Sequence, residues 1–169
     1  MLEMTVTLAI ITTVLLLAIP NFQMGRDRER LRTQTQALES DLRQAQAHTM
    51  AQNVQGVSAT NNAIAPVMVQ VDQKNNNYKI FKDQNSNGVL DAGEVTQTVT
   101  LHPRVRFGNF AGPCLNTGQT ILCTIAFDPL TGRVPAAATE SFVLELTQNA
   151  KNPISKTLTI SESGLVSLN

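Results

Sequence analysis

Aromatic residues are scarce in this chain: they make up 4% of 169 residues, with no Trp. This argues against sites that bind sugars or single-stranded nucleic acids by stacking. Two cysteines are too few for a disulfide scaffold or a cysteine-only zinc site. Because 13 basic residues balance 13 acidic ones, the chain lacks the strong positive charge typical of nucleic-acid-binding proteins.

Sequence motifs of enzymes are also missing. The two histidines, His48 and His102, lie far apart, and neither belongs to a ligand pair. No nucleophile elbow, phosphate-binding loop or dinucleotide-binding glycine pattern occurs. We therefore expect a protein that is not an enzyme and has no catalytic residues.

The apolar residues, 42% of the chain, are concentrated at the N-terminus, where residues 4–25 carry no charge. A membrane-spanning helix needs about 17–25 largely apolar residues, which predicts such a helix over residues 1–25. The alternative is a removable signal peptide. That class has basic residues before the apolar run and a small-residue cleavage site after it, and neither is present here.

Two residues are unusual in this apolar stretch. Glu3 would place a carboxylate at the edge of hydrocarbon, either as a flanking charge among lipid headgroups or as the partner of another chain's terminal amine. Pro20 removes one backbone hydrogen bond from the helix. We therefore expect a kink or local unwinding near residues 16–20.

The run LEMTVTLAIITTVLLLAIPNF resembles the N-terminal helix of type IV pilins and type II secretion pseudopilins. Leu2-Glu3 matches the family's aliphatic-Glu step, and Pro20 follows at the family's spacing. The resemblance implies that Glu3 neutralises the terminal amine of a neighbouring subunit, and that Pro20 lets the helix adapt during assembly. It implies as partners other pilins or pseudopilins, the inner membrane, and prepilin peptidase if a leader precedes this helix.

Residues 26–54 contain no Pro or Gly and predict the amphipathic half of the same helix. One face is expected to pack on the head and is formed by Leu31, Thr35, Leu38, Leu42, Ala45 and Thr49. A coiled coil is the alternative, although the stripe is weak. Four arginines at 26–32 alternate with acidic residues, which favours a solvated, self-paired face over a nucleic-acid site, with anionic lipid as a third possibility.

The segment ALESDLRQAQAHTMAQNVQGV is similar to the helix end of GspH/FimT-type minor pilins and pseudopilins. Leu38, Leu42, Arg43, Ala45 and Ala51 follow that pattern. The resemblance narrows the expected family to this type.

Residues 55–169 predict a β-rich globular head. Runs of alternating β-branched and polar residues, separated by turn-forming clusters, indicate strands at 67–71, 78–81, 95–101, 121–127, 141–146, 156–160 and 165–168. The expected fold class is α+β, pilin-like, with the long N-terminal helix packed on an antiparallel β-sheet or small β-sandwich.

The segment DQNSNGVLDAGE at 83–94 matches the pattern of a calcium-binding loop. Candidate ligands are side-chain oxygens and one backbone carbonyl, from Asp83, Asn85, Asn87, Val89, Asp91 and Glu94. Hard oxygen donors suit Ca²⁺. The alternative is a metal-free polar hairpin turn at Asn87-Gly88.

Cys114 and Cys123 bracket a turn at residues 116–119. Two free thiols in a β core would be the ordinary arrangement inside the cell. The resemblance to pilins implies export to an oxidising compartment, which favours a disulfide between them.

The expected function is a non-enzymatic filament subunit: a minor pilin or pseudopilin of a type IV pilus or a type II secretion pseudopilus. Its place is the bacterial inner membrane, with a periplasmic or extracellular head, and then the filament. The alternative is a minor pilin at the pilus tip that binds DNA for uptake, which needs a basic patch on the head. The basic residues available for it are scattered, so nucleic acid is not expected as a partner.

Overall fold

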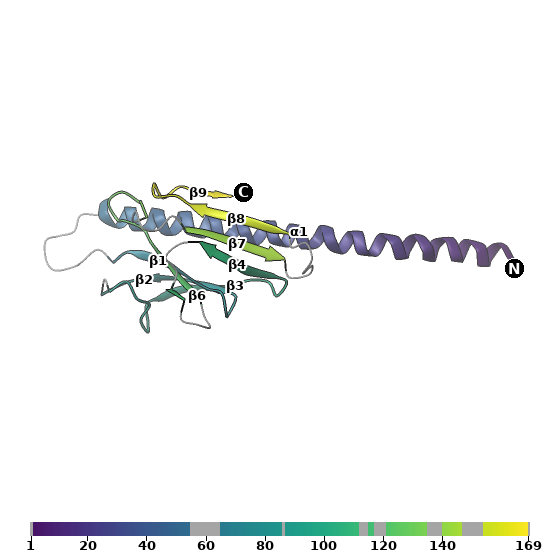
Figure 1. The fold of residues 1–169 in the computed structure, drawn as a ribbon, viewed down its shortest axis with the longest axis horizontal. Coiled ribbons are helices and arrows are strands. Elements are labelled where there is room, and N and C mark those ends of the chain that lie inside the picture. Colours follow the sequence, from purple (N-terminus) through teal and green to yellow (C-terminus); the bar gives the residue numbers. More distant parts are fainter. Residues whose placement is uncertain are drawn as a thin grey trace.

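A computed structural model shows one long helix packed against two antiparallel sheets (Figure 1). It describes residues 2–54, 65–85, 87–111, 115–116, 121–134, 140–146 and 154–168; at 2, 16–24, 52–54, 109, 111, 115–116 and 140–146 only the backbone is described. The elements in chain order are α1 (Leu2–Val54), β1 (Val67–Asp72), β2 (Asn77–Lys82), β3 (Val95–Thr100), β4 (Val105–Ala111), β5 (Leu115–Asn116), β6 (Ile121–Ala126), β7 (Glu140–Leu146), β8 (Ser155–Ile160) and β9 (Val166–Leu168).

The C-terminal half of α1 buries the stripe that the sequence predicts. All six of its members are buried, and Asp27 extends the stripe by one further turn toward the N-terminus. Arg28, Arg32 and Arg43 on the other side of the helix are exposed, as expected of an amphipathic helix. This half of the helix is therefore part of the head, and the coiled-coil alternative does not describe the packing seen.

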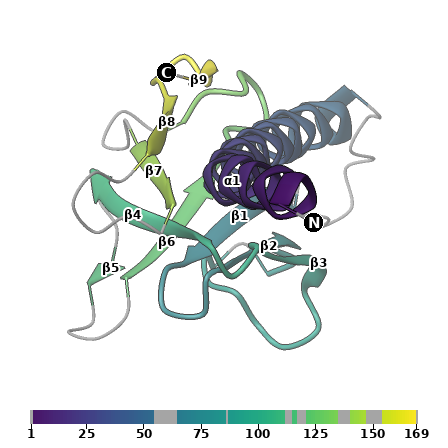
Figure 2. The ribbon, with the colours of Figure 1, turned by 90° about the vertical axis from the view of Figure 1, so that its right-hand side faces the viewer.

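The strands form two sheets of different size. The first has the order β3-β2-β1-β6-β5 and the second the order β4-β7-β8-β9, and each strand pairs with its neighbours in antiparallel fashion. Seen along the helix, the two sheets lie on different sides of α1 (Figure 2). The helix contacts β1 of the first sheet and β7, β8 and β9 of the second.

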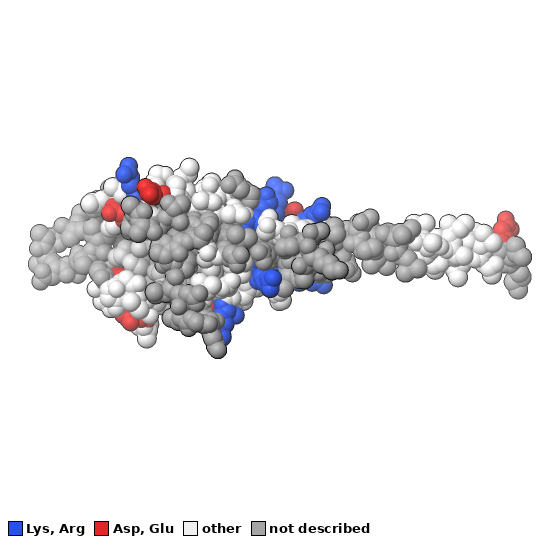
Figure 3. Space-filling view, viewed as in Figure 1, with Lys and Arg blue, Asp and Glu red and all other residues white. Residues whose placement is uncertain are grey.

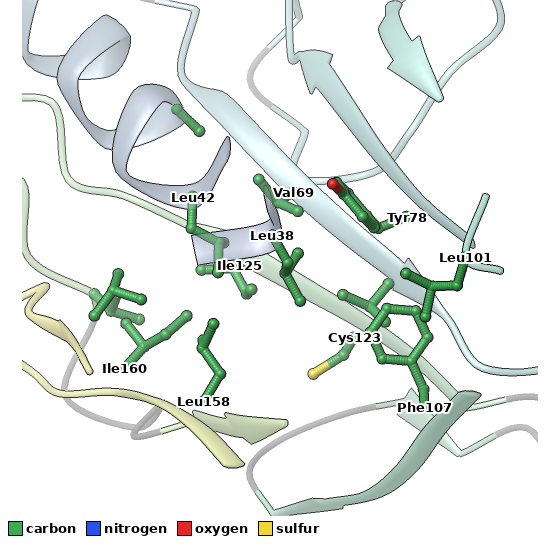
Figure 4. Packing of buried hydrophobic residues seen from close by; sticks show 14 of the residues in the cluster. Leu38, Leu42, Val69, Tyr78, Leu101, Phe107, Cys123, Ile125, Leu158 and Ile160 are labelled. Carbon is green, nitrogen blue, oxygen red and sulfur yellow. The ribbon is translucent and has the colours of Figure 1, made fainter. Parts of the chain in front are cut away.

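The hydrophobic core lies between the helix and both sheets. Leu38 and Leu42 of α1 point toward Val69 and Ile125 of the first sheet, and Leu158 of the second sheet completes this layer (Figure 4). All five side chains are almost fully buried. Since the helix supplies one wall of the core, the sheets cannot bury their inner faces without it.

The turn between β1 and β2 joins the two sheets. Asn76 has a positive φ of 52° there, a conformation that Asn tolerates better than most residues. Its Nδ2 donates to the carbonyl of Val105 (2.7 Å), and its Oδ1 accepts from the N–H of Phe107 (3.2 Å). Gln73 donates from Nε2 to the carbonyl of Gly108 at 2.7 Å. The turn is thus tied to β4 of the other sheet.

The predicted α+β class and the antiparallel head are confirmed, and the head consists of two sheets. The seven predicted strands all occur, with ends shifted by no more than one residue. β4 and β5 were not predicted from the sequence. β4 reads VRFGNFA, and its register shifts between Phe107 and Phe110, so its side chains do not alternate as an undisturbed strand requires.

Among the described residues, no helical stretch combines the length and the apolar character that a membrane span requires.

Candidate functional site

The N-terminal half of α1 extends away from the head (Figure 1). Its large apolar side chains from Met4 to Leu15 are exposed, with Met4 at 77% and Leu8 at 67%. The hydroxyls of Thr7, Thr12 and Thr13 donate to carbonyls of the preceding turn; that of Thr7, for example, donates to the carbonyl of Glu3 at 3.1 Å. This half of the helix therefore presents a largely apolar surface.

The two predicted assembly residues lie on this extended half. Glu3 is in the first turn of α1, where a carboxylate is stabilised by the helix dipole, and its side chain is exposed. At Pro20 the backbone is helical, so local unwinding does not occur there, while its side chain lies outside the described residues. The role of both residues in assembly stays a prediction.

A buried ion-pair cluster fixes α1 where it enters the head. The carboxylate of Asp27, with 3% of its side chain exposed, is 3.0 Å from Nη1 of Arg104 and 3.2 Å from Nη1 of Arg30. Arg104 comes from the loop between β3 and β4, so the cluster joins helix and sheet. The cluster was not predicted from the sequence, although Asp27 stands four residues before Leu31 and so on the buried stripe.

A second polar link between helix and sheet lies further along α1. The hydroxyl of Tyr78 on β2 donates to Oδ2 of Asp41 at 2.6 Å. Burial and the nearby carboxylate both raise the pKa of Tyr78 far above its ordinary value of 10.0. This pair was not predicted either, since nothing local in the sequence brings residues 41 and 78 together.

The loop between β2 and β3 brings the predicted calcium ligands into one hydrogen-bond network. Asp83, fully buried, accepts from the N–H of Gly88 at 2.7 Å and from the N–H of Asn87 at 3.2 Å. Glu94 accepts through Oε1 from the N–H of Gln84 (2.9 Å) and through Oε2 from the N–H of Asp91 (3.0 Å). The two carboxylates thus hold the loop closed from its two ends.

The middle of the loop is joined through Asp91. Its Oδ2 accepts from Nδ2 of Asn85 (2.7 Å) and from Nδ2 of Asn87 (2.8 Å). Val89 contributes its N–H, which donates to Oδ1 of Asn87 at 2.7 Å. Gly88 has a φ of 73°, as the sharp turn requires. Among the described residues, no group of three or more His, Cys, Asp or Glu side chains is placed to hold a metal ion. Calcium binding stays a prediction.

Cys123 is buried on β6, next to Leu122, whose partner on β5 is Leu115. Cys114 lies outside the described residues. The disulfide between these two residues stays a prediction.

The two histidines lie apart, as expected from their positions in the sequence. Nε2 of His48 is 3.4 Å from Nε2 of Gln44 on the next turn of α1. His102, in the loop after β3, donates its backbone N–H to Oε1 of Gln34 at 3.0 Å. Each is thus held locally, beside a different part of the helix.

Comparison with known families agrees with the helix and head described above. A family model, described as type II transport protein GspH, matches residues 34–164, which is more than half of the chain. The match covers most of the packed half of α1 and nearly the whole head. No curated protein and no solved structure matches the chain. The chain therefore belongs to the GspH family of pseudopilin-type minor pilins.

Proposed function

We propose that this chain is a minor pseudopilin of a type II secretion system, a non-enzymatic subunit built into the pseudopilus through its N-terminal helix. The exposed apolar side chains of α1 between Met4 and Leu15 are the observation that carries this proposal. Its large side chains would be costly to leave in water, so they need either lipid or the matching helices of neighbouring subunits as cover. Family membership supports the secretion machine as the setting.

In this proposal the two halves of α1 have different tasks. The apolar half is held in the inner membrane before assembly and packs among other pseudopilin helices afterwards. The half from Arg26 onward carries the head, which stands outside the membrane. Glu3 would pair with the terminal amine of a neighbour and so set the register between subunits, because an unpaired carboxylate among apolar helices is costly.

The Glu3→Ala variant tests this role. We expect it to insert into membranes as the wild type does, but to lose at least tenfold of its crosslinking to other pseudopilins in cells that assemble the filament. Glu162→Ala, which removes an exposed carboxylate from the turn between β8 and β9, is the matched control and should assemble normally. Normal incorporation of Glu3→Ala would refute the proposed pairing.

We also propose that the loop at 83–94 binds Ca²⁺. The pattern of oxygen-bearing side chains supports this, and a half-turn of the amides of Asn85 and Asn87 would exchange Nδ2 for Oδ1 and present oxygens to an ion. The ion would fix the hairpin between β2 and β3; no chemical step is assigned to it.

Calcium titration of the full chain in mild detergent tests the loop. With a dissociation constant of about 10⁻⁴–10⁻³ M, Ca²⁺ at about 10 mM should raise the free energy of unfolding by roughly 1.4–2.7 kcal/mol. Glu94→Gln should abolish the increase, whereas Glu162→Gln should retain it. An equal increase in both variants would mean that Ca²⁺ acts elsewhere.

The alternative of a DNA-binding minor pilin is a separate hypothesis. It requires a basic surface on the exposed part of the head, whereas the arginines near Asp27 gather at the base of the head (Figure 3). No observation on the described residues favours it as a second proposal.

A further inference from the structure

Five arginines surround the place where α1 enters the head, and we name them the basal collar. Arg26, Arg28, Arg30 and Arg32 lie on α1, and Arg104 reaches them from the loop between β3 and β4. All but Arg30 are exposed, and Arg30 is partly exposed. Figure 3 shows basic side chains gathered at this end of the head, beside the extended helix.

The carboxylates within the basal collar do not cancel its charge. Asp27 is buried beneath the arginines and is paired with Arg104 and Arg30, and Glu29 is the other acidic residue of this segment. Five arginines against two carboxylates leave a net charge of +3. Since the whole chain balances 13 basic and 13 acidic residues, the remainder carries −3. The collar is thus a local concentration of positive charge in a chain that is neutral as a whole.

The basal collar follows directly on the uncharged stretch of α1. Residues 4–25 carry no charge and, at about 1.5 Å per residue, span roughly 33 Å. The hydrocarbon core of a bilayer is about 30 Å thick. If this half of the helix is held in the membrane, as the proposed function states, the collar lies at the depth of the lipid phosphates.

A hollow on one side of the collar brings two of its guanidinium groups together, beside the Glu29 carboxylate. Its volume is about 390 Å³, and it is lined by Arg26, Glu29, Arg30, Thr33, Gln34 and His102. Two guanidinium groups and a hydroxyl can donate hydrogen bonds there, and arginine binds phosphate oxygens in pairs. Arg28 and Arg32 lie outside the hollow, one helical turn apart from each other and outside the Asp27 cluster.

We infer that the basal collar binds the phosphate groups of anionic lipids while the subunit waits in the membrane. The occupant is lipid because the collar stands at the end of an uncharged stretch of bilayer length and has the opposite charge to such headgroups. This inference rests on the proposed function, in which the subunit is held in the membrane before assembly. It adds a preference for lipids with anionic headgroups.

Binding of short-chain lipids to the full chain in neutral detergent micelles tests the inference. The probes are short-chain phosphatidylglycerol and, as the neutral comparison, short-chain phosphatidylcholine. Arg28→Gln combined with Arg32→Gln should weaken binding of phosphatidylglycerol by about fivefold per arginine and leave phosphatidylcholine unchanged. Neither arginine is part of the Asp27 cluster, so the helix should remain docked, which circular dichroism can check.

The matched control removes two positive charges at the other end of the head. Lys82→Gln combined with Arg133→Gln changes exposed residues that lie near helix residues 41–50, far along α1 from the collar. The control should bind phosphatidylglycerol within twofold of the wild type. Equal binding of the two lipids by the wild type, or an equal loss in both double variants, would overturn the inference.

Two further outcomes would also overturn it in favour of another partner. Retained lipid preference with lost crosslinking to pseudopilins in the collar variant would assign Arg28 and Arg32 to a subunit contact. Salt-dependent binding of a short DNA duplex in place of phosphatidylglycerol would assign them to nucleic acid. Lipid preference is measured on the isolated chain, so it can fail while incorporation into the filament, the test of the proposed function, succeeds.

Discussion

At the scale of single residues, the polar contacts that link distant parts of the chain could not be predicted from the sequence. Asp27, Asp41, Asn76 and Tyr78 each make contacts with residues distant in the chain, and none belongs to a recognisable motif. The hydrophobic stripe of α1, by contrast, was predictable because its spacing is local. The loop at 83–94 shows the same division: its residues were predictable from a pattern, whereas the amide and carboxylate pairings within it were not.

The ionisation of Tyr78 yields a prediction in the alkaline range. Its pKa is raised in the folded protein, so the neutral phenol stabilises the fold below the unfolded value of 10.0, and this stabilisation decreases as the pH rises above that value. Since Tyr78 is the only Tyr and there is no Trp, ultraviolet absorbance of the tyrosinate reports on this group alone.

Two variants separate the causes of this effect. Tyr78→Phe should cost about 1 kcal/mol at neutral pH, the value of a typical hydrogen bond, and should flatten the alkaline fall in stability. Asp41→Asn retains an acceptor but removes the negative charge, so the absorbance titration of Tyr78 should move to lower pH. A wild-type protein whose folded state titrates at the ordinary value would contradict the burial of this hydroxyl.

At the scale of elements, the structure depends on close contacts between loops and the helix. Nε2 of Gln46 donates to the carbonyl of Gly132 at 2.7 Å, and Nη2 of Arg43 donates to the carbonyl of Val166 at 3.2 Å. The turn between β8 and β9 contains Gly164 with a φ of 77°. These contacts fix the loop after β6 and the edge strand β9 to the helix, beside its buried stripe.

Gly164→Ala should therefore disturb this contact. A Cβ at this position would lie 2.2 Å from the carbonyl oxygen of Gly132 and 2.5 Å from Nε2 of Gln46. Backbone must shift to admit it, and we expect a loss of about 2–4 kcal/mol in the free energy of unfolding, from strain in φ together with overpacking.

Gly88→Ala is the matched control for this change. Its φ of 73° is nearly the same, but nothing lies within 4 Å of the added Cβ. In the presence of a calcium chelator it should lose only about 1–2 kcal/mol, the strain of a left-handed residue. Denaturant unfolding of both full-length variants measures the difference, and equal losses would show that the loops do not meet the helix as closely as described.

The elements themselves were predictable to very different degrees. Strands with clean alternation and the hairpin at residues 156–168 follow from local pattern and turn chemistry. β4 carries a bulge around Gly108 and follows Pro103, so its period is disturbed. β5 has only two residues and depends on its pairing with β6. Such strands are defined by their partners more than by their own composition.

At the scale of the whole molecule, the division of the strands between two sheets could not be predicted from the sequence. β4 pairs with β7, and β1 pairs with β6, so the pairings that separate the sheets join distant parts of the chain. Local patterns carry no information about such partners. The overall class could still be predicted, because a long amphipathic helix followed by short strands has few ways to bury its stripe.

The continuity of α1 has a mechanical consequence. The helix runs from Leu2 to Val54 without an intervening linker, and the Asp27 cluster fastens it to the β3–β4 loop at the point of entry. A shift of the N-terminal half along its axis must therefore carry the whole head with it. Force applied near Glu3 would be transmitted along the helix axis to the sheets.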